Sequence, residues 1–481
     1  MVVQHNMQAM NANRMLNVTT STQAKATEKL SSGYKINRAA DDAAGLTISE
    51  KMRKQIKGLD RASTNAEDGV SSVQTAEGAL TEVHSMLQRM NELAVQASNG
   101  TNSESDRSAI QDEISQLTTE IDRVSETTKF NETYLLKGSD GTKDIYMKGH
   151  DAGLSGTLTD GTTSATFKVA AGALDSGKNV TIAGKEYKIG TAKADVQTAV
   201  DAITDEGDQV IVNGKTYTYT KKGGAGKTDE GWVEGSTAPE GATLAYGKKN
   251  AANALSIADG DKVTVKVANK ATDYVAADVD ADGVSKSDTS IITAAKAVKL
   301  MTTELEAANN IGTTKKAATV TADNAGYTPD NGITFTIDKG TAEVAEKLSF
   351  SLHVGADADM TNKINVDIES MSSAGLGIKG LNVKDDSGKA ATYAIDAIAD
   401  AVAKVSSQRS ALGAVQNRLE HTIANVDNVV ENTTSAESRI RDTDMAETMV
   451  EYSKNNILAQ AGQSMLAQAN QSNQGVLSLL Q

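Results

Sequence analysis

The sequence predicts a mainly α-helical fold with an α+β insertion. Both ends of the chain form one long helical coiled coil or bundle, and the middle forms one or more β-rich outer domains. Three segments with the same seven-residue apolar repeat indicate this fold. Two of them lie before residue 130 and one lies after residue 390, so a common bundle has to join the two ends of the chain.

The longest apolar seam runs from Ile395 to Val430, where only Arg409 and Gln416 interrupt a spacing of three and four residues. An α-helix turns once in about 3.6 residues, so this spacing draws one narrow stripe that must pack on partner helices and favours a left-handed supercoil. At ~1.5 Å per residue the helix is roughly 55 Å long. Such a helix is typical of extended bundles rather than of compact enzymes.

Two further seams near the start of the chain supply the partner helices. The first comprises Val73, Ala76, Leu80, Val83, Leu87, Met90, Ala94 and Ala97, and the second comprises Ile110, Ile114, Leu117, Ile121 and Val124. Each Leu, Ile or Val that is fully buried contributes about 1.5–3 kcal/mol relative to exposure. The three seams together are therefore sufficient to hold a bundle.

The first helix is expected over residues 1–31 and should end at Gly33, which suits a turn. The second helix should start near Asp41 and Asp42, whose carboxylates favour the positive end of the helix dipole. It should end at Gly100, which we expect to be a left-handed C-cap.

Two more helices have boundaries that the sequence indicates. The third should open at Ser103, because Asp106 three positions later completes a capping box, and should fade near Thr128. The last helix is expected to begin after Asp442 and to continue to the end of the chain.

In the middle of the chain the apolar spacing changes from helical to alternating. Short strands are expected at Tyr134–Leu136 and Ile145–Met147. The segment Val180–Tyr187 recurs thirty residues later as Val210–Tyr217, and both copies have the pattern of a hairpin. In the second copy, Asn213-Gly214 favours a tight primed turn.

Further elements follow the same signals. Helices are expected at Asp195–Ile203 and Ile291–Leu305, and strands at Lys262–Val267, Ile333–Ile337, Leu348–Val354 and Lys363–Ile368. These elements predict three parts. Residues 1–40 and 440–481 form a terminal coiled coil, residues 41–149 and 348–439 form a helical bundle with short strands, and residues 150–347 form an α+β outer region, with two subdomains as one option.

The two tails resemble each other in composition. Residues 1–13 carry no formal charge, and residues 453–481 carry one, on Lys454. Isolated helices are marginal in water, so we expect both tails to be disordered in the monomer and to order by packing on one another and on neighbouring subunits. The apolar residues expected to make these contacts are Met7, Met10, Ile457, Met465, Leu466, Val476, Leu477, Leu479 and Leu480.

Composition excludes several classes of function. The formal net charge is −15, which argues against nucleic acid as a partner. There is no cysteine, so neither disulfides nor thiolate metal sites are available. No segment has the length of a signal peptide's apolar run or of a membrane span. These tests alone predict a cytosolic protein, unless the chain is exported without a cleaved signal.

One short motif resembles a phosphate-binding loop. Gly226-Lys227-Thr228 follows a predicted strand, but the pattern requires glycine at position 221, which is Lys221, and no helix follows. We therefore assign no nucleotide or other cofactor here. No zinc-binding helix and no Ser/His/Asp constellation is visible among the scattered histidines, so we assign no catalytic residue. The histidines are His5, His84, His150, His353 and His421.

A second motif resembles half of a calcium loop. Asp278, Asp280 and Asp282 match its first positions, but the acid that should close the loop falls on Thr289, and no entry helix precedes the motif. A solvated acidic turn is the alternative interpretation. We assign no metal site to it.

Several segments closely resemble motifs of bacterial flagellins. The resemblance covers residues 1–149 and 348–481, and nothing comparable is found in the middle of the chain. The segments that carry it are Glu28–Asn37 followed by Asp41–Leu46, Gln88–Gln96 with Ile121–Val124, Leu412–Leu419, and the ending Val476–Leu480. The chain departs from many flagellins by ending in Gln481 rather than arginine, and it lacks the metalloprotease insert that some members carry.

The resemblance implies a structural protein, not an enzyme. It implies a homopolymer, the helical filament of the bacterial flagellum, with coiled-coil tails in the filament core. It also implies an extracellular location reached through the flagellar secretion channel without signal cleavage. The partners that it implies are the export chaperone, the cap and hook-junction proteins, and the flagellin-sensing Toll-like receptor, with no nucleic acid and no membrane.

A candidate contact patch lies on the second helix. Leu93 is off the apolar seam, with Arg89 one turn before it on the same side and Glu92 beside it. The alternative is an ordinary surface leucine, which is common. In flagellins, the positions that match Arg89, Leu93 and Glu113 form the patch recognised by the Toll-like receptor, and the same face packs between subunits. The resemblance therefore favours a receptor and subunit contact at Arg89, Glu92, Leu93 and Glu113.

Overall fold

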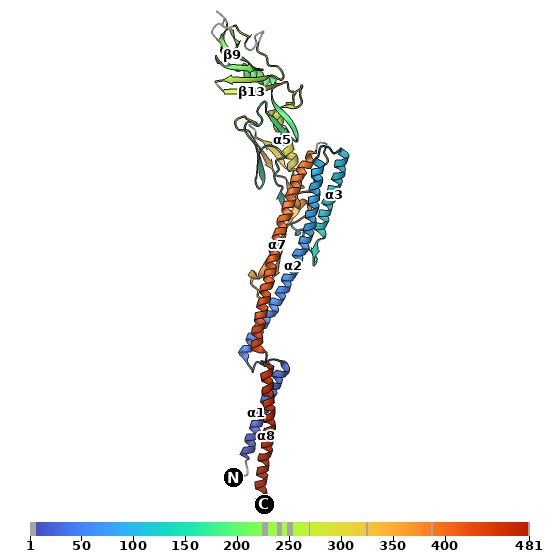
Figure 1. Cartoon of the computed structure of the whole chain (residues 1–481), viewed down its shortest axis with the longest axis vertical. Coiled ribbons are helices and arrows are strands. Elements are labelled where there is room, and N and C mark those ends of the chain that lie inside the picture. Colours follow the sequence, from blue (N-terminus) through green and yellow to red (C-terminus); the bar gives the residue numbers. More distant parts are fainter. Residues whose placement is uncertain are drawn as a thin grey trace. The chain divides into compact units, whose positions relative to one another are not determined.

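The computed structural model describes residues 6–223, 229–237, 243–247, 254–268, 270–323, 326–385 and 388–479. The chain divides into two compact units. The first contains Met1–Gln74, Phe350–Val366 and Leu412–Gln481, and the second contains Thr75–Ser349 and Asp367–Ala411. Each unit combines segments from both ends of the chain, which confirms the predicted joining of the ends. The mainly helical fold with a β-rich insertion is also confirmed (Figure 1).

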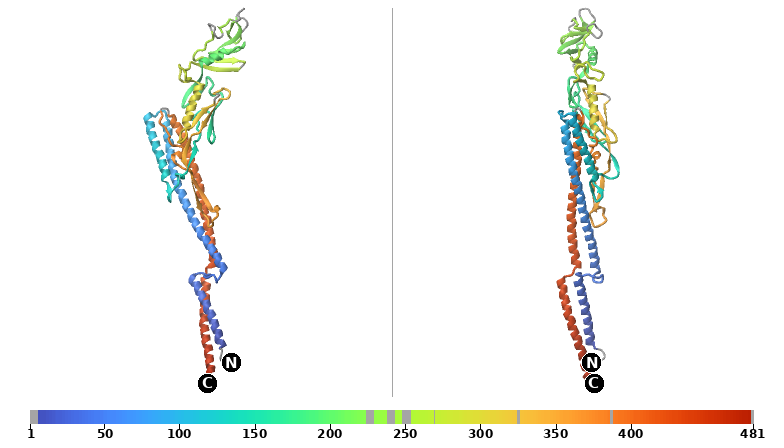
Figure 2. Two further views of the ribbon diagram at one scale, coloured as in Figure 1. Left: turned by 180° about the vertical axis from the view of Figure 1, so that it is seen from behind. Right: turned by 90° about the vertical axis from the view of Figure 1, so that its right-hand side faces the viewer.

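Helices α2 and α3 begin and end within a few residues of the predicted positions, whereas α7 extends six residues before and eleven residues after the predicted seam. The long helices are α1 Met7–Ser32, α2 Ala43–Ser98, α3 Glu104–Thr127, α7 Lys389–Arg441 and α8 Met445–Leu479, and the short ones are α4 Lys193–Asp201, α5 Ala294–Asn309, α6 Ser373–Leu376 and the 3-10 turn η1 Met360–Asn362. Figure 2 shows α2 and α7 as long helices that run beside each other.

The ends of these helices follow from local hydrogen bonds. Helix α1 ends at Gly33, whose φ of 76° is the left-handed conformation that glycine favours. Asp42 Oδ1 accepts a hydrogen bond from the backbone amide of Gly45 at 2.9 Å, which caps the start of α2. The predicted capping box of α3 is confirmed, since Ser103 and Asp106 each accept the other's backbone amide.

The end of α2 differs from the prediction. Gly100 does not adopt a positive φ, so the expected left-handed cap is wrong. The guanidinium of Arg107 instead donates to the carbonyl oxygens of Ala97 at 3.0 Å and Asn99 at 3.4 Å, and also to that of Asp385 at 3.2 Å. Arg107 is buried. A side chain from α3 therefore satisfies the carbonyls that a helix end leaves unpaired.

The predicted seams are the buried stripes of the helices. All eight seam residues of α2 are completely buried. On α7 the predicted seam residues that are buried lie seven residues apart, and the predicted seam residues between them are half-buried. The buried seam residues of α7 are Ile398, Val405, Leu412, Leu419 and Val426. The seven-residue repeat therefore identified the packed face of each helix.

In the first unit, a small hairpin covers the helices. Strands β18 (Leu348–His353) and β19 (Lys363–Ile368) pair with each other, as the two predicted strands do. Leu352 and Ile364 pack with Ala66 of α2 and Leu419 of α7 in one hydrophobic cluster. Asn65 of α2 donates to the carbonyl oxygen of His353 at 3.0 Å. The hairpin is therefore part of the helical core.

The second unit contains the remaining strands. They are β1 Lys129–Phe130, β2 Thr133–Tyr134, β3 Thr142–Tyr146, β4 Thr157–Asp160, β5 Ser164–Val169, β6 Asn179–Ile182, β7 Lys185–Ala192, β8 Gln209–Val212, β9 Lys215–Gly223, β10 Asp229–Glu234, β11 Tyr246–Gly247, β12 Lys262–Val267, β13 Lys270–Ala277, β14 Ile291–Thr293, β15 Thr319–Ala322, β16 Ile333–Asp338 and β17 Thr341–Ala345.

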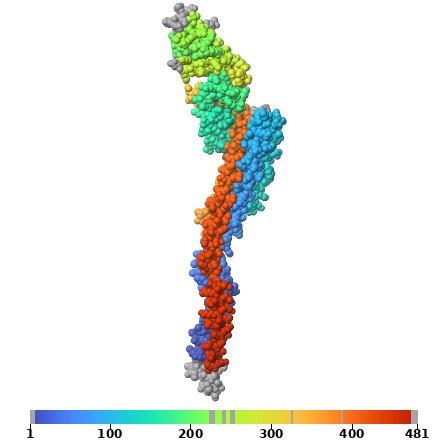
Figure 3. Space-filling view, viewed as in Figure 1, coloured from blue at the N-terminus to red at the C-terminus, as the bar shows by residue number. Residues whose placement is uncertain are grey.

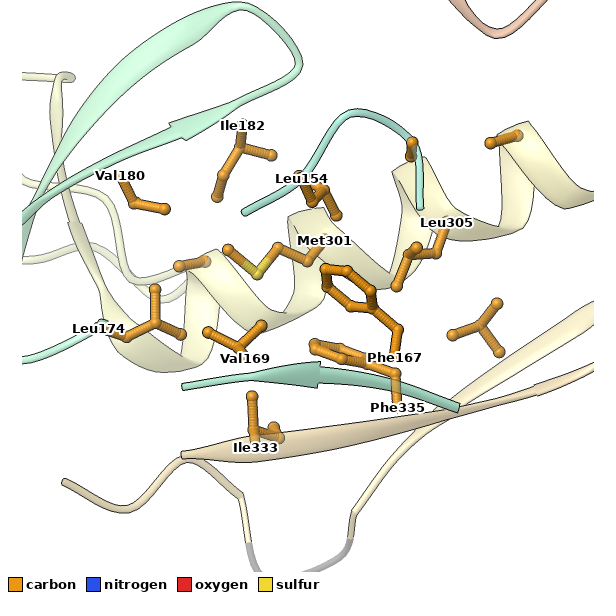
Figure 4. Close-up of a cluster of buried hydrophobic side chains, with 14 of the residues drawn as sticks. Leu154, Phe167, Val169, Leu174, Val180, Ile182, Met301, Leu305, Ile333 and Phe335 are labelled. Carbon is orange, nitrogen blue, oxygen red and sulfur yellow. The ribbon is translucent and has the colours of Figure 1, made fainter. Parts of the chain in front are cut away.

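One of the sheets in this unit has the order β15-β16-β5-β4 and is antiparallel throughout. Its side chains pack on α5. Figure 4 shows Phe167 and Phe335 from adjacent strands between the sheet and the α5 residues Met301 and Leu305. The two rings lie 6.1 Å apart. Tyr393 of α7 belongs to the same cluster, so the sheet is anchored on the bundle.

The larger sheet has the order β11-β10-β9-β8-β12-β13-β7-β14, with β6 paired to β7. Both copies of the sequence repeat form hairpins, as predicted. Their turns have two consecutive positive φ angles, at Ala183 and Gly184 and at Asn213 and Gly214, which primed turns require. This sheet has its own hydrophobic cluster around Trp232, separate from the cluster on α5.

Some element predictions are wrong. The segment Ile291–Leu305 begins as strand β14 before it becomes α5. Of Tyr134–Leu136, only Tyr134 is in a strand. Strand β3 pairs with β17 (Thr341–Ala345), which was not predicted. Pairing of segments so far apart in the chain leaves no local signal in the sequence.

We expect Arg107→Leu to lower the free energy of unfolding by about 2–4 kcal/mol, because it removes the buried hydrogen bond to the carbonyl oxygen of Ala97 and those to Asn99 and Asp385. Urea unfolding followed by far-UV circular dichroism measures this. The control is Arg123→Ala, since Arg123 is exposed and pairs only with Glu120 on its own helix. An Arg107 variant as stable as this control would contradict the capping role.

Candidate functional site

Helices α1 and α8 pair along a seam of small and polar side chains. Among the described residues, the fully buried ones on these helices are Ala26, Thr448 and Asn455. Gly462 faces Leu16, and Asn6 donates to the carbonyl oxygen of Ala469 at 3.1 Å. On α8 the buried and half-buried positions repeat every three and four residues, namely Thr448, Tyr452, Asn455, Ala459, Gly462, Leu466 and Ala469. Such small residues allow close approach but bury little apolar surface.

The large apolar side chains of the two helices face away from this seam. Among the described residues, seventeen large hydrophobic side chains are exposed, and ten of them belong to α1 or α8. The ten are Met7, Met10, Met15 and Val18 on α1, and Met445, Met449, Val450, Ile457, Leu458 and Met465 on α8. Figure 3 shows α8, in red, at the molecular surface. Contiguous apolar surface of this kind indicates an interaction site.

On α8 the exposed side chains form a shallow groove. Its lining residues are Met449, Val450, Ser453, Lys454, Ile457 and Leu458, and its volume is about 510 Å³. Val450 and Ile457 lie seven residues apart, as do Leu458 and Met465, which keeps them along one side of the helix. Lys454 is the single charged residue of the segment 453–481. The groove is therefore suited to an apolar partner.

The predicted tail residues take two different positions. Met7, Met10, Ile457 and Met465 are more than half exposed on the outer faces. Leu466 instead lies half-buried in the seam that faces α1. The side chains of Val476, Leu477, Leu479 and Leu480 lie outside the described residues. The sequence analysis did not find the inner seam, although its regular spacing from Thr448 onward is a signal that would have shown it.

The second predicted patch is a cluster of charges on α2 and α3. Arg89 donates to Glu113 at 2.9 Å and to Glu92 at 3.2 Å. The hydrogen bond with Glu113, followed by that with Glu92, raises the pKa of Arg89. All three side chains are substantially exposed. The structure therefore brings together the three predicted charged residues on one surface.

The predicted position of Leu93 is wrong. Leu93 is only 2% exposed, so it is not a surface residue. The end of α2 packs on two partners, since Arg89 pairs with Glu113 of α3 and Glu77 lies 3.7 Å from Arg409 of α7. A helix between two partners buries a wider stripe than the two-position seam of a simple coiled coil.

A signal for this wider stripe is present in the sequence. Ala79, Met86 and Leu93 recur every seven residues beside the seam, and the first two are half-buried. This second row of apolar residues indicates a second partner helix.

The other candidate sites show no chemistry of their own. Within the described part of the chain, no three His, Asp or Glu side chains gather closely enough to hold a metal ion. In the half calcium loop, Asp280 Oδ1 accepts the amides of Asp282 and Val284, both at 3.0 Å, and Asp278 pairs with Lys286 at 3.1 Å. These contacts organise an acidic turn.

The phosphate-loop candidate, Gly226-Lys227-Thr228, lies outside the described residues. Of the described helices, none combines the length and apolarity needed to cross a membrane. The surfaces that the structure offers for function are therefore the outer faces of α1 and α8 and the Arg89 cluster.

A helical frame made by both chain ends, with a β-rich insertion and exposed apolar faces on the terminal helices, defines a class of helical structural proteins. Comparison with known proteins identifies the family. The bacterial flagellin N-terminal helical region matches residues 3–140, and the bacterial flagellin C-terminal helical region matches residues 395–480. The flagellin of Clostridium tyrobutyricum is 40% identical over 98% of this chain and 100% of its own length.

Other flagellins match over the same extent. The flagellin of Bacillus subtilis (strain 168) is 35% identical over 100% of both chains, and flagellin B of Vibrio cholerae is 33% identical over 99% of both. The chain therefore belongs to the bacterial flagellin family, the structural subunits of the flagellar filament. This confirms the resemblance seen in the sequence.

Solved structures also resemble the chain, but less closely. FliC from Burkholderia pseudomallei is 21% identical, with a TM-score of 0.27 over 73% of this chain and 99% of that chain. Flagellar hook associated protein-3 from Legionella pneumophila is 14% identical, with a TM-score of 0.32 over 81% of this chain and 98% of that chain. Both TM-scores are low, so the family assignment depends on the sequence comparisons.

We expect Leu93→Ala to destabilise the helical bundle by about 2–5 kcal/mol, as truncation of a buried leucine does. The matched control is Val95→Ala, because Val95 is on the same helix and 51% exposed. It should change stability by less than about 0.5 kcal/mol. Urea unfolding of the two variants compares them directly, and equal stability would show that Leu93 is not buried in solution.

Proposed function

We propose that this chain assembles into the bacterial flagellar filament through the outer faces of α1 and α8. The observation that carries the proposal is that ten large apolar side chains of these helices are exposed, while the buried positions between them are small or polar, such as Ala26 and Asn455. A monomer gains nothing from this arrangement, since exposed methionine and isoleucine side chains are hydrated. Copies of the chain that cover these faces would remove them from water.

The free energy gained by burying these apolar side chains, compared with the cost of association, supports assembly through several neighbouring subunits. Burying the six exposed apolar side chains of α8 would contribute roughly 9–18 kcal/mol as an upper bound, at about 1.5–3 kcal/mol each. Association costs about 4–15 kcal/mol in lost translational and rotational freedom. A single contact is therefore marginal, and a polymer in which both terminal helices are covered is favoured.

The proposal includes the parts that the family resemblance supports. Within the predicted limits 1–40 and 440–481, helices α1 and α8 are disordered in the monomer and order during polymerisation, while Tyr34 and Arg441 keep their contacts with α2. The outer region, residues 150–347, decorates the filament and is not required for its assembly. The chain leaves the cell through the flagellar secretion channel without signal cleavage, and it meets the export chaperone and the cap and hook-junction proteins.

A second function is proposed for the Arg89 cluster, as the contact with the flagellin-sensing Toll-like receptor. Arg89 is held between Glu92 and Glu113 on an exposed surface, and arginine is enriched at contact hot spots. Because Leu93 is buried, we assign it to supporting the cluster rather than to direct contact. The same surface also contacts neighbouring subunits in the filament.

We expect Ile457→Asp to prevent filament formation, because a carboxylate would have to be desolvated in an apolar contact, at a cost of several kcal/mol. The concentration needed for assembly should rise at least about a hundredfold. Negative-stain electron microscopy and sedimentation of concentrated full-length protein measure this.

The control for this experiment is Val267→Asp in the larger sheet, where Val267 is also partly exposed. It should form filaments as the unmodified chain does. If Ile457→Asp forms filaments at the same protein concentration as the unmodified chain, α8 is not part of the assembly contact. Failure of the unmodified chain itself to form filaments would contradict the proposed function.

We expect Arg89→Ala to weaken binding of the monomer to the receptor while its helical content stays unchanged. The control is Arg123→Ala, another exposed arginine paired with a glutamate of its own helix. Biolayer interferometry with the receptor ectodomain compares the two. Receptor affinity equal for both variants would show that the Arg89 cluster is not the contact. Leu93→Ala is unsuitable for this test, because it perturbs the core.

A further inference from the structure

The chain crosses between two helix pairs at one point within the first unit. The crossing consists of the segment that connects α1 to α2 and the segment that connects α7 to α8. Helices α1 and α8 lie on one side of it, and α2 and α7 lie on the other side (Figure 1). The backbone of Tyr34 forms a bridge with that of Asp442. The amide of Lys35 donates to the carbonyl oxygen of Arg441 at 2.7 Å, and that of Thr443 donates to Gly33 at 3.0 Å. Few backbone bonds therefore hold the crossing together.

The ring of Tyr34 lies against two guanidinium groups at this crossing. The guanidinium carbon of Arg441, at the end of α7, is 5.0 Å from the ring centroid. That of Arg53, on α2, is 6.0 Å from it. Both distances are within the range of a cation–π contact, which is ~6 Å. One aromatic ring from the connecting segment thus contacts cations from both long helices.

Each guanidinium also pairs with a carboxylate on the opposite helix. Arg441 lies 2.6 Å from Glu50 of α2, and Arg53 lies 3.1 Å from Glu437 of α7. The side chains of Arg441 and Glu437 are 15% and 14% exposed, so water screens them poorly. The two pairs cross between the helices, with one cation and one anion on each. Each guanidinium therefore has its carboxylate partner only when both helices are in place.

A single surface ion pair contributes little to stability. This arrangement differs, because two partly buried pairs share one ring and their helices close the same crossing. Loss of the ring would leave each guanidinium with its carboxylate alone. The ring is the element that joins the connecting segment to both pairs.

We propose that Tyr34 is a latch that fixes the crossing and stops unfolding of the terminal helices from spreading into α2 and α7. The latch consists of Tyr34, Arg53, Arg441, Glu50 and Glu437. The terminal helices fray or reorient on one side of the latch, and the long helices stay formed on the other side. Tyr34 is a positioning residue for the terminal helices. Its role concerns the isolated chain and does not depend on polymerisation.

Hydrogen exchange of the full-length monomer tests the latch. In Tyr34→Leu, amides at the start of α2 (residues 43–53) and the end of α7 (residues 430–441) should exchange about five- to thirtyfold faster than in the unmodified chain, as expected for the loss of two cation–π contacts. Tyr34→Phe keeps the ring but loses the hydroxyl that hydrogen-bonds with Arg53, so exchange should rise clearly less than in Tyr34→Leu. Amides of α3 should be unaffected in both variants, which shows that the protein remains folded.

Tyr134→Leu is the matched control, because Tyr134 is exposed and has only Lys137 near its ring, at 5.5 Å. It should leave exchange at the crossing unchanged. High salt should speed exchange there in the unmodified chain more than in Tyr34→Leu, since salt screens the partly exposed charges. The latch would be overturned if amides at the crossing exchanged as slowly in Tyr34→Leu as in the unmodified chain. It would also be overturned if Tyr34→Phe accelerated their exchange as much as Tyr34→Leu does.

Discussion

The rest of the structure depends on the seven-residue apolar seam shared by α2 and α7. The seam residues of α2 are completely buried, and the buried residues of the α7 seam lie seven residues apart. This apolar surface leaves water only if segments from opposite ends of the chain meet. Everything between them is then an excursion that must leave the bundle and return to it, as β18 and β19 do at its edge.

The two helix pairs use this period for opposite purposes. In α2 and α7 the large apolar residues face inward, and the frame is stable within one copy. In α1 and α8 the buried positions are small or polar, such as Ala26 and Asn455, and ten large apolar residues are exposed, although Leu466 is half-buried in the seam. The same helical geometry therefore gives a self-sufficient frame in one place and an incomplete surface in the other. The connecting segment at Tyr34 lies between the self-sufficient helix pair, α2 and α7, and the incomplete pair, α1 and α8.

Much of this organisation is predictable, because helix packing and capping are encoded in short-range patterns. The capping box of Ser103 and the turn at Asn213-Gly214 depend on a few neighbouring residues. The predictions fail where a distant partner decides. Leu93 is buried because α2 has two partner helices, and the end of α2 is capped by Arg107 rather than by Gly100.

The candidate site was predicted only in part, because local patterns locate its charged residues but do not show which tail residues face a partner helix. The charged residues Arg89, Glu92 and Glu113 meet because the helix periods place them on facing surfaces. The tail residues were chosen for their apolar character, but this does not tell an outer face from an inner seam. Ile457 faces outward and Leu466 faces α1, and only the pairing of the two helices distinguishes them.

The central claim is that the outer faces of α1 and α8 are covered when copies of the chain associate. Hydrogen exchange of polymer and monomer, measured on the same preparation, tests it most directly. The account predicts strong new protection in residues 7–32 and 445–472 of the polymer, with little change in β12 and β13. Terminal helices that exchange equally fast in both states, while another surface becomes protected, would contradict it.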